Sequence, residues 1–203
     1  MPSDSLSLSR RAFGAGLAAG TGFLAFALPV RALSVDQARG LIDQVVSEVN
    51  SVINSGKSEG AMFVDFERIF ATYADVATIA RSALGPVAKQ ASGAQMTAFT
   101  KAFQGYISRK YGRRFREFIG GSIEVTDSKP VKSFFEVVSV ASLQGEAPFD
   151  LRWHVSDKSG KNLFFNIIIE GVNMLASERT EIGALMDKNG GDLNATIEMM
   201  KSI

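Results

Sequence analysis

Apolar residues recur every three or four positions through the first half of the chain after residue 33, and this spacing predicts amphipathic helices. Ser34 and Gln37 form a capping box at the start of the first helix, which ends near Gly56. A second periodic segment runs to Gly85, and Asp75 within it is suited to start a further helix because it can accept from first-turn amides. The first stripe comprises Ala38, Leu41, Val45, Val49 and Val52, and the second comprises Phe66, Ile69, Phe70, Tyr73, Val76 and Ala80.

A second capping box, Ser92 with Gln95, opens the longest predicted helix, which ends at Gly120 and Gly121. Its apolar positions follow at spacings of three and four, which predicts one buried face. They are Met96, Phe99, Phe103, Ile107, Tyr111, Phe115 and Phe118.

Beyond residue 122 the period changes to two, which predicts strands at 123–126, within 131–143, at 149–156 and at 163–170, with a hairpin turn at 157–161. The third strand is expected to place Phe149, Leu151, Trp153 and Val155 on one face, with Asp150, Arg152, His154 and Ser156 on the other. The fourth strand is apolar on both faces and so needs cover on both. We expect Leu163, Phe165, Ile167 and Ile169 on one of its faces, and Phe164 and Ile168 on the other.

Two short helices around 177–188 and 192–201 end the chain. Helices first and antiparallel strands afterwards predict an α+β fold, with helices packed on a curved antiparallel sheet that encloses an apolar pocket.

The first 32 residues have the pattern of a twin-arginine signal peptide. Arg10 and Arg11 precede an aromatic residue, and an uncharged run over 15–28 follows that is too short to span a bilayer, which takes about 20 apolar residues. Small residues at 30 and 32 suit a signal peptidase, so one domain should begin near Leu33 and extend over 33–203. The leucine and lysine that usually follow the aromatic residue are absent, so general secretion stays open.

Composition then narrows the function of the remaining domain. Removing residues 1–32 takes three arginines and one aspartate from 22 basic and 21 acidic residues, which leaves 19 basic and 20 acidic side chains and a net charge of −1. This balance argues against nucleic-acid binding. With no cysteine and a single histidine, His154, we expect no metal site and no disulfide.

Motifs for catalysis are scarce, and we expect no catalytic residues. The chain has no thiol nucleophile, phosphate loop or serine elbow. His154 lies on the polar face of a predicted strand, and Asp75, Asp157 and Glu170 have local roles as cap, turn or strand end. A buried carboxylate in an aromatic cavity would still permit proton transfer, as in an enzyme of ketosteroid-isomerase-like layout.

Fifteen phenylalanines in 203 residues suit either an ordinary core or a cavity for an apolar ligand between sheet and helices. The long helix also carries a basic stripe, which suits either a solvated face or a docking face for anionic headgroups or an acidic partner. From this stripe we select Arg109, Arg113 and Arg116 as partner-docking residues.

Three segments carry a resemblance by their order and spacing. ARSALG at 80–85 ends a predicted helix, aromatic residues recur over 98–115 in the long helix, and EGVNM at 170–174 is followed by Arg179. These segments resemble, in turn, the A-R-x-x-L-G signature, the long helix and the E-G-[VI]-S-[LM]…R element of the MlaC family, the toluene-tolerance family of periplasmic phospholipid-binding proteins. The family's tryptophan near the last strand, the aspartate before E-G and the serine after it are replaced here, with asparagine at 166 and 173, which indicates a divergent member such as the hopanoid-associated relatives.

The resemblance implies a periplasmic carrier, not an enzyme, with a phospholipid as ligand and no cofactor. It would be a monomer that shuttles lipid between an inner-membrane ABC transporter complex and an outer-membrane lipoprotein–porin complex. An isomerase-like enzyme and a protein-binding adaptor without a cavity stay as alternatives. The lipid-binding residues expected to face the pocket are Phe66, Phe70, Phe103, Trp153, Phe165, Ile167 and Val172.

Replacing both Arg10 and Arg11 by lysine tests the export route. If the paired arginines are read by the twin-arginine machinery, the variant should no longer reach the periplasm. Cell fractionation measures this, and export that continues largely intact would instead assign the chain to general secretion.

Overall fold

Six α-helices and five strands lie within residues 33–203, the part of the chain that the computed structural model describes, apart from the side chains at 114–116. The predicted signal peptide, with Arg10 and Arg11, lies outside the described residues. The helices are α1 (Val35–Ile53), α2 (Glu59–Tyr73), α3 (Val76–Leu84), α4 (Gly93–Arg114), α5 (Met174–Lys188) and α6 (Leu193–Ser202). The strands are β1 (Ser122–Val131), β2 (Phe134–Ser142), β3 (Phe149–Ser156), β4 (Leu163–Ile169) and β5 (Val172–Asn173).

Three predicted helix starts are confirmed, whereas the helix expected over 177–188 begins at Met174. Ser34 and Gln37 form a complete capping box on α1. Ser92 and Gln95 make the same pair of hydrogen bonds before α4. Asp75 caps α3 by accepting from the backbone N–H of Thr78 at 3.0 Å. The end of α4 differs from the prediction, because the helix stops at Arg114 and a 3-10 helix (Phe115–Phe118) continues to the glycines.

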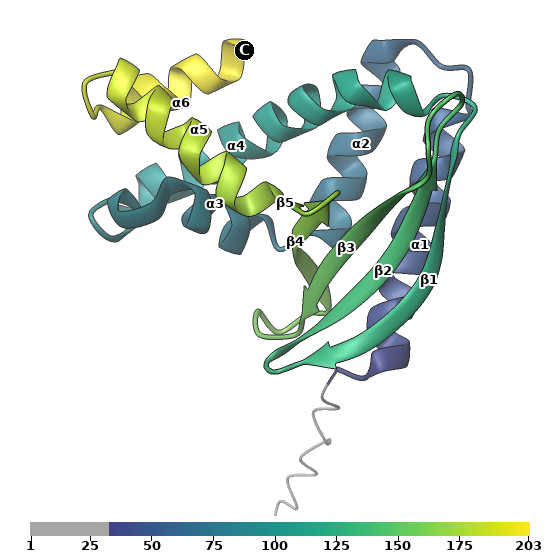
Figure 1. Ribbon diagram of the computed structural model, residues 1–203. Helices are drawn as coiled ribbons and strands as arrows, with labels where there is room; N and C mark the ends of the chain where they lie inside the picture. Colours follow the sequence, from purple (N-terminus) through teal and green to yellow (C-terminus); the bar gives the residue numbers. More distant parts are fainter. Residues whose placement is uncertain (1–32) are drawn as a thin grey trace, which may run out of the picture. The chain divides into compact units, whose positions relative to one another are not determined.

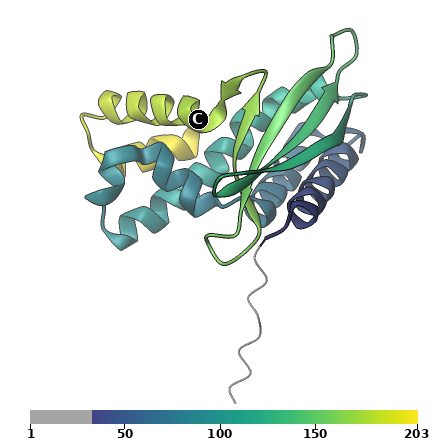
Figure 2. The ribbon, with the colours of Figure 1, turned by 60° about the horizontal axis from the view of Figure 1, so that its bottom comes forward.

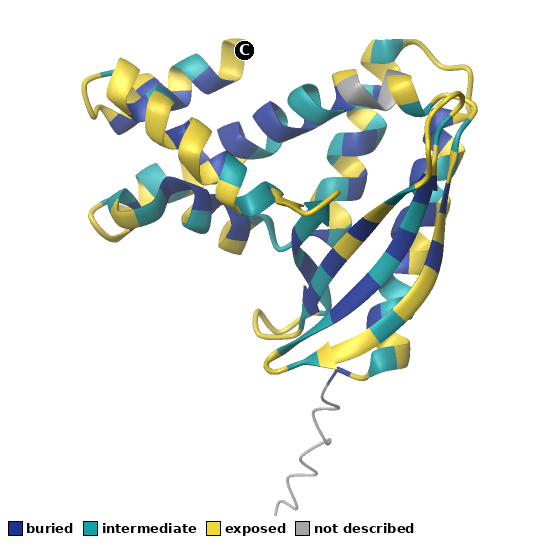
Figure 3. Cartoon of the chain, viewed as in Figure 1, coloured by how far each residue is buried: buried dark blue, intermediate teal, exposed yellow. Residues whose placement is uncertain are grey.

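The five strands form one antiparallel sheet in chain order, β1-β2-β3-β4-β5 (Figure 1). α1 packs along the inner face of β1 and β2, as Figures 1 and 2 both show. α3, α4, α5 and α6 pack against one another beyond β4. Buried residues alternate with more exposed ones along β3 (Figure 3), so Leu151, Trp153 and Val155 share one buried face as predicted, and Phe149 at the start of the strand is half-buried. The α+β fold with a curved antiparallel sheet is confirmed.

A hairpin and a bulge depart from the predicted strands. β1 extends to Val131, and Lys132 turns the chain with a φ of 49°, so that β2 begins at Phe134. In the β3–β4 register, His154 opposes Asn166 and Val155 opposes Phe164, which leaves Phe165 as an extra residue. A β-bulge of this kind shifts the alternation by one residue.

The expected faces of β4 were therefore wrong at its start. Phe164 lies on the face of Trp153, with the two ring centroids 5.3 Å apart in a T-shaped arrangement. Leu163 opposes Ser156 instead of sharing a face with Ile167. The Phe165 ring packs edge-on against Phe134 at a centroid distance of 5.6 Å.

Asp75 joins the helical layer to the sheet, because its backbone N–H donates to the carbonyl of Phe164 at 2.8 Å while its side chain caps α3. Replacing Asp75 by alanine should lower the free energy of unfolding by about 1 kcal/mol, the usual cost of losing an N-cap. Asp75→Asn retains a cap acceptor and serves as the matched control in urea denaturation. Equal losses in the two variants would contradict the capping role.

Candidate functional site

A cavity of about 190 Å³ lies between the inner face of the sheet and the helices α1, α2, α3, α4 and α5. Its wall is almost entirely apolar. The lining residues are Val45, Val46, Val49, Phe66, Ile69, Phe70, Ile79, Ile107, Ser108, Tyr111, Phe118, Ile123, Leu151, Trp153, Phe164, Phe165, Asn166, Ile167, Ile169, Met174, Leu175 and Glu178.

The helical and strand periodicities build this wall. Val45 and Val49 are four residues apart on α1, and Phe66 and Phe70 are four apart on α2, so each pair presents one face of its helix. On the opposite side lie Leu151 and Trp153, two residues apart on β3, and residues 164–167 and Ile169 of β4, where Trp153 is paired with Ile167. The wall is therefore formed by the apolar faces of helices and strands that are far apart in the sequence.

Trp153 is held in place by a buried hydrogen bond. Its indole Nε1 donates to the hydroxyl of Ser139 at 2.8 Å, and Ser139 is fully buried. The donor of the indole is thus satisfied, and the rest of the ring is free to present apolar surface to the cavity.

Five of the seven predicted lipid-binding residues lie together in the cavity wall: Phe66, Phe70, Trp153, Phe165 and Ile167. Phe103 lies elsewhere, because it is fully buried and stacks on Phe99 with a centroid distance of 5.9 Å. Val172 is 54% exposed on the two-residue strand β5.

The sequence did not predict several of the cavity-lining residues as part of a site. Ile107 and Tyr111 belong to the predicted stripe of α4, but nothing in their spacing distinguishes them from Phe103 one turn earlier. Glu178 was not predicted at all, because a glutamate on a short terminal helix is typical of a solvated surface.

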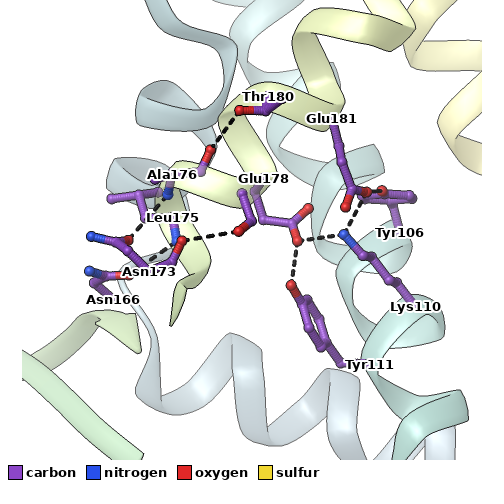
Figure 4. A network of polar contacts seen from close by, with 11 residues as sticks. Tyr106, Lys110, Tyr111, Asn166, Asn173, Leu175, Ala176, Glu178, Thr180 and Glu181 are labelled. Carbon is purple, nitrogen blue, oxygen red and sulfur yellow. Dashed lines mark hydrogen bonds and ion pairs between the residues drawn. The ribbon is translucent and has the colours of Figure 1, made fainter. Parts of the chain in front are cut away.

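Two of the cavity-lining residues, Tyr111 and Glu178, belong to a polar network (Figure 4). Glu178 is only 3% exposed, and its Oε1 accepts from Tyr111 and from Lys110 Nζ, the latter at 2.7 Å. Lys110 also donates to Glu181 at 2.6 Å, and Tyr106 donates to Glu181 at 2.9 Å. The network therefore extends from a buried carboxylate in the wall to an exposed one on α5.

The predicted docking arginines have different surroundings. The guanidinium of Arg109 donates to the backbone carbonyls of Met200 and Ile203 at 2.6 and 2.9 Å, so it stabilises the last turn of α6. Arg113 is exposed. The side chain of Arg116 lies outside the described residues. Partner docking by these arginines stays a prediction.

His154 does not line the cavity. Its Nε2 lies 3.7 Å from Glu136, and its ring lies 4.5 Å from that of Phe134 and 5.8 Å from that of the wall residue Phe165. Burial lowers the pKa of His154, although the charge of Glu136 opposes this. Among residues 33–203 no cluster of three or more acidic or histidine side chains is placed to hold a metal ion.

The fold and the site define an α+β protein with an apolar cavity between its sheet and its helices. A family model described as MlaC protein matches residues 43–202, and the chain belongs to the MlaC family. The structure is also similar to that of a phospholipid-binding protein from Ralstonia solanacearum in complex with a phospholipid, with a TM-score of 0.69 and 17% sequence identity. The match covers 81% of this chain and 95% of that chain, and it confirms the fold.

No helix within the described residues 33–203 combines the length and the apolar character needed to cross a bilayer.

The network makes stability sensitive to alkaline pH. Burial and then the hydrogen bond to Glu178 raise the pKa of Tyr111 far above its ordinary value of 10.0, and burial and Glu181 act likewise on Tyr106. Above pH 10.0 the unfolded chain releases these protons while the folded protein retains them, so the free energy of unfolding falls as pH rises.

Replacing Tyr111 by phenylalanine should make this alkaline decline shallower, by up to about 1.4 kcal/mol per pH unit, because one of the protons that the folded protein retains is gone. Urea denaturation of both proteins at several pH values above 10 measures the slopes. Parallel slopes would show that Tyr111 does not retain its proton.

Proposed function

We propose that this protein is a periplasmic phospholipid carrier. It holds the acyl tails of one lipid in the apolar cavity, keeps the headgroup outside, and shuttles the lipid between an inner-membrane ABC transporter complex and an outer-membrane lipoprotein–porin complex. The observation that carries the proposal is the apolar cavity between the sheet and α1, α2, α3, α4 and α5.

The physical need for such a cavity follows from the hydrophobic effect. Each methylene group that leaves water gains about 0.8 kcal/mol, so a lipid crosses an aqueous space only if a protein encloses its tails. A wall that includes Phe66, Trp153 and Ile167 supplies the required apolar contact. The phospholipid bound by the Ralstonia solanacearum protein of the same fold supports this class of ligand.

The cavity volume bears on how the ligand enters. At about 190 Å³ it is smaller than the roughly 300 Å³ at which pockets for drug-sized ligands begin. Two acyl tails therefore require the walls to separate, and we propose that lipid entry moves the helices away from the inner face of the sheet.

Export and partners complete the proposal. The signal peptide predicted for residues 1–32 would deliver the domain to the periplasm, by the twin-arginine or the general route. There it would act as a monomer without a cofactor, and the exposed part of the basic stripe, including Arg113, would dock on the membrane complexes.

A second candidate function uses the same cavity. Glu178 and Tyr111 give the wall a buried carboxylate and a phenol, the groups that an isomerase-like enzyme needs. Prolonged incubation of the loaded protein separates the two functions by lipid mass spectrometry. Lipid recovered chemically unchanged supports the carrier, whereas a product that Glu178→Gln no longer forms supports the enzyme.

Solvent extraction of the purified protein followed by lipid mass spectrometry tests the carrier directly. We expect about one phospholipid per chain. Protein that is reproducibly free of lipid, even after exposure to phospholipid vesicles, would overturn the proposal.

Replacing Val49 by phenylalanine should reduce the bound lipid several-fold, because Val49 is 5% exposed and its side chain lines the cavity, so the larger ring occupies ligand space. Val64→Phe is the matched control, since Val64 is 68% exposed on α2. Circular dichroism establishes that both variants are folded. Equal lipid content in the two variants would contradict the assignment of this cavity.

A further inference from the structure

Glu178 is the one carboxylate in the wall of the apolar cavity described above. It is 3% exposed, and taking a charge out of water is costly unless partners offset the loss of hydration. In an otherwise apolar wall, each oxygen of this carboxylate therefore needs a hydrogen-bond donor.

The two oxygens of Glu178 differ in their surroundings. Oε1 accepts hydrogen bonds from Tyr111 and from Lys110 at 2.7 Å. Oε2 is buried and accepts none from the described residues. A carboxylate can accept about four hydrogen bonds, and an unsatisfied buried acceptor costs roughly 1–3 kcal/mol, more when it is charged.

The other members of the network are more exposed than Glu178 itself. The side chain of Lys110 is 26% exposed and that of Glu181 is 48% exposed, compared with 4% for Glu178. Tyr111, which donates to Glu178 (Figure 4), also lines the cavity. A lipid with its tails among the apolar residues would therefore place its polar end nearest to this group.

We infer that Oε2 of Glu178 accepts a hydrogen bond from one N–H or O–H donor at the polar end of the bound lipid, while the rest of the headgroup stays outside the cavity. This inference rests on the proposed lipid-carrying function and adds selectivity to it. A primary ammonium or a glycerol hydroxyl satisfies the oxygen, whereas a trimethylated ammonium has no hydrogen to donate and leaves it unpaired. Because the acceptor is charged, each such bond favours the donor lipid by about tenfold or more.

Glu178→Gln is a sharp test, because the amide oxygen can still accept from Tyr111 and Lys110 while an NH2 group replaces the unpaired oxygen. Glu181→Gln removes a charge from the same network at an exposed position and is the matched control. Circular dichroism and native mass spectrometry of the lipid-loaded proteins show that each variant is folded and binds.

Two series of ligands with identical acyl chains distinguish the donor. The first compares phosphatidylethanolamine, its N,N-dimethyl derivative and phosphatidylcholine, in which the last N–H disappears only at the final step. The second compares diacylglycerol with its acetylated form, which removes the hydroxyl. Competition for delipidated protein, read by native mass spectrometry, measures the preference in each series.

Wild type and Glu181→Gln should prefer the donor lipid by about tenfold in at least one series, and Glu178→Gln should lose that preference. A preference in the first series identifies an ammonium, and a preference in the second identifies a hydroxyl. Equal binding in both series, or a preference that Glu178→Gln retains, would overturn the inference while the carrier function stands. Failure of wild type to bind any of these lipids would overturn the carrier function itself.

Discussion

The cavity depends on hydrogen bonds that join its walls at their edges. Protein interiors pack as densely as organic crystals, so an apolar space persists only where the surrounding elements are held in place. Asn50 of α1 exchanges two hydrogen bonds with the backbone of Ile123 in β1, at 2.9 and 3.0 Å. Asn166 of β4 accepts from the backbone N–H of Leu175 in α5 at 3.1 Å. These polar contacts hold the walls in position, and the apolar side chains between them line the cavity.

Local sequence signals predicted the elements well, because caps and periodicity act within a few residues. Ser34, Asp75 and Ser92 each begin or precede a helix as their side-chain chemistry requires. Periodicity could not predict which residues of one apolar helix stripe pack in the core and which line the cavity. Phe103 and Ile107 lie one turn apart on α4, yet the first packs on Phe99 and the second faces the cavity. Packing between elements distant in sequence decides between them.

The bulge in β4 and the role of Glu178 escaped prediction for a related reason. Alternation assigns faces only while the register is continuous, and the extra residue Phe165 interrupts it. Glu178 has the sequence context of a surface residue, and only the approach of Tyr111 and Lys110 from α4 shows that it is buried and partnered. Both features arise from contacts between separate elements, which no local pattern records.

The side-chain contacts of α1 also have a consequence for the free edge of the sheet. A strand with unpaired backbone groups invites pairing with another chain and hence aggregation. At the outer edge of β1, the guanidinium of Arg39 donates to the carbonyl of Val125 at 3.0 Å. The side chain of Asn50 hydrogen-bonds to both the backbone N–H and the carbonyl of Ile123. Further along, Pro130 offers no N–H. The contacts that seat α1 on the sheet therefore also protect a protein with an apolar interior from adding strands edge to edge.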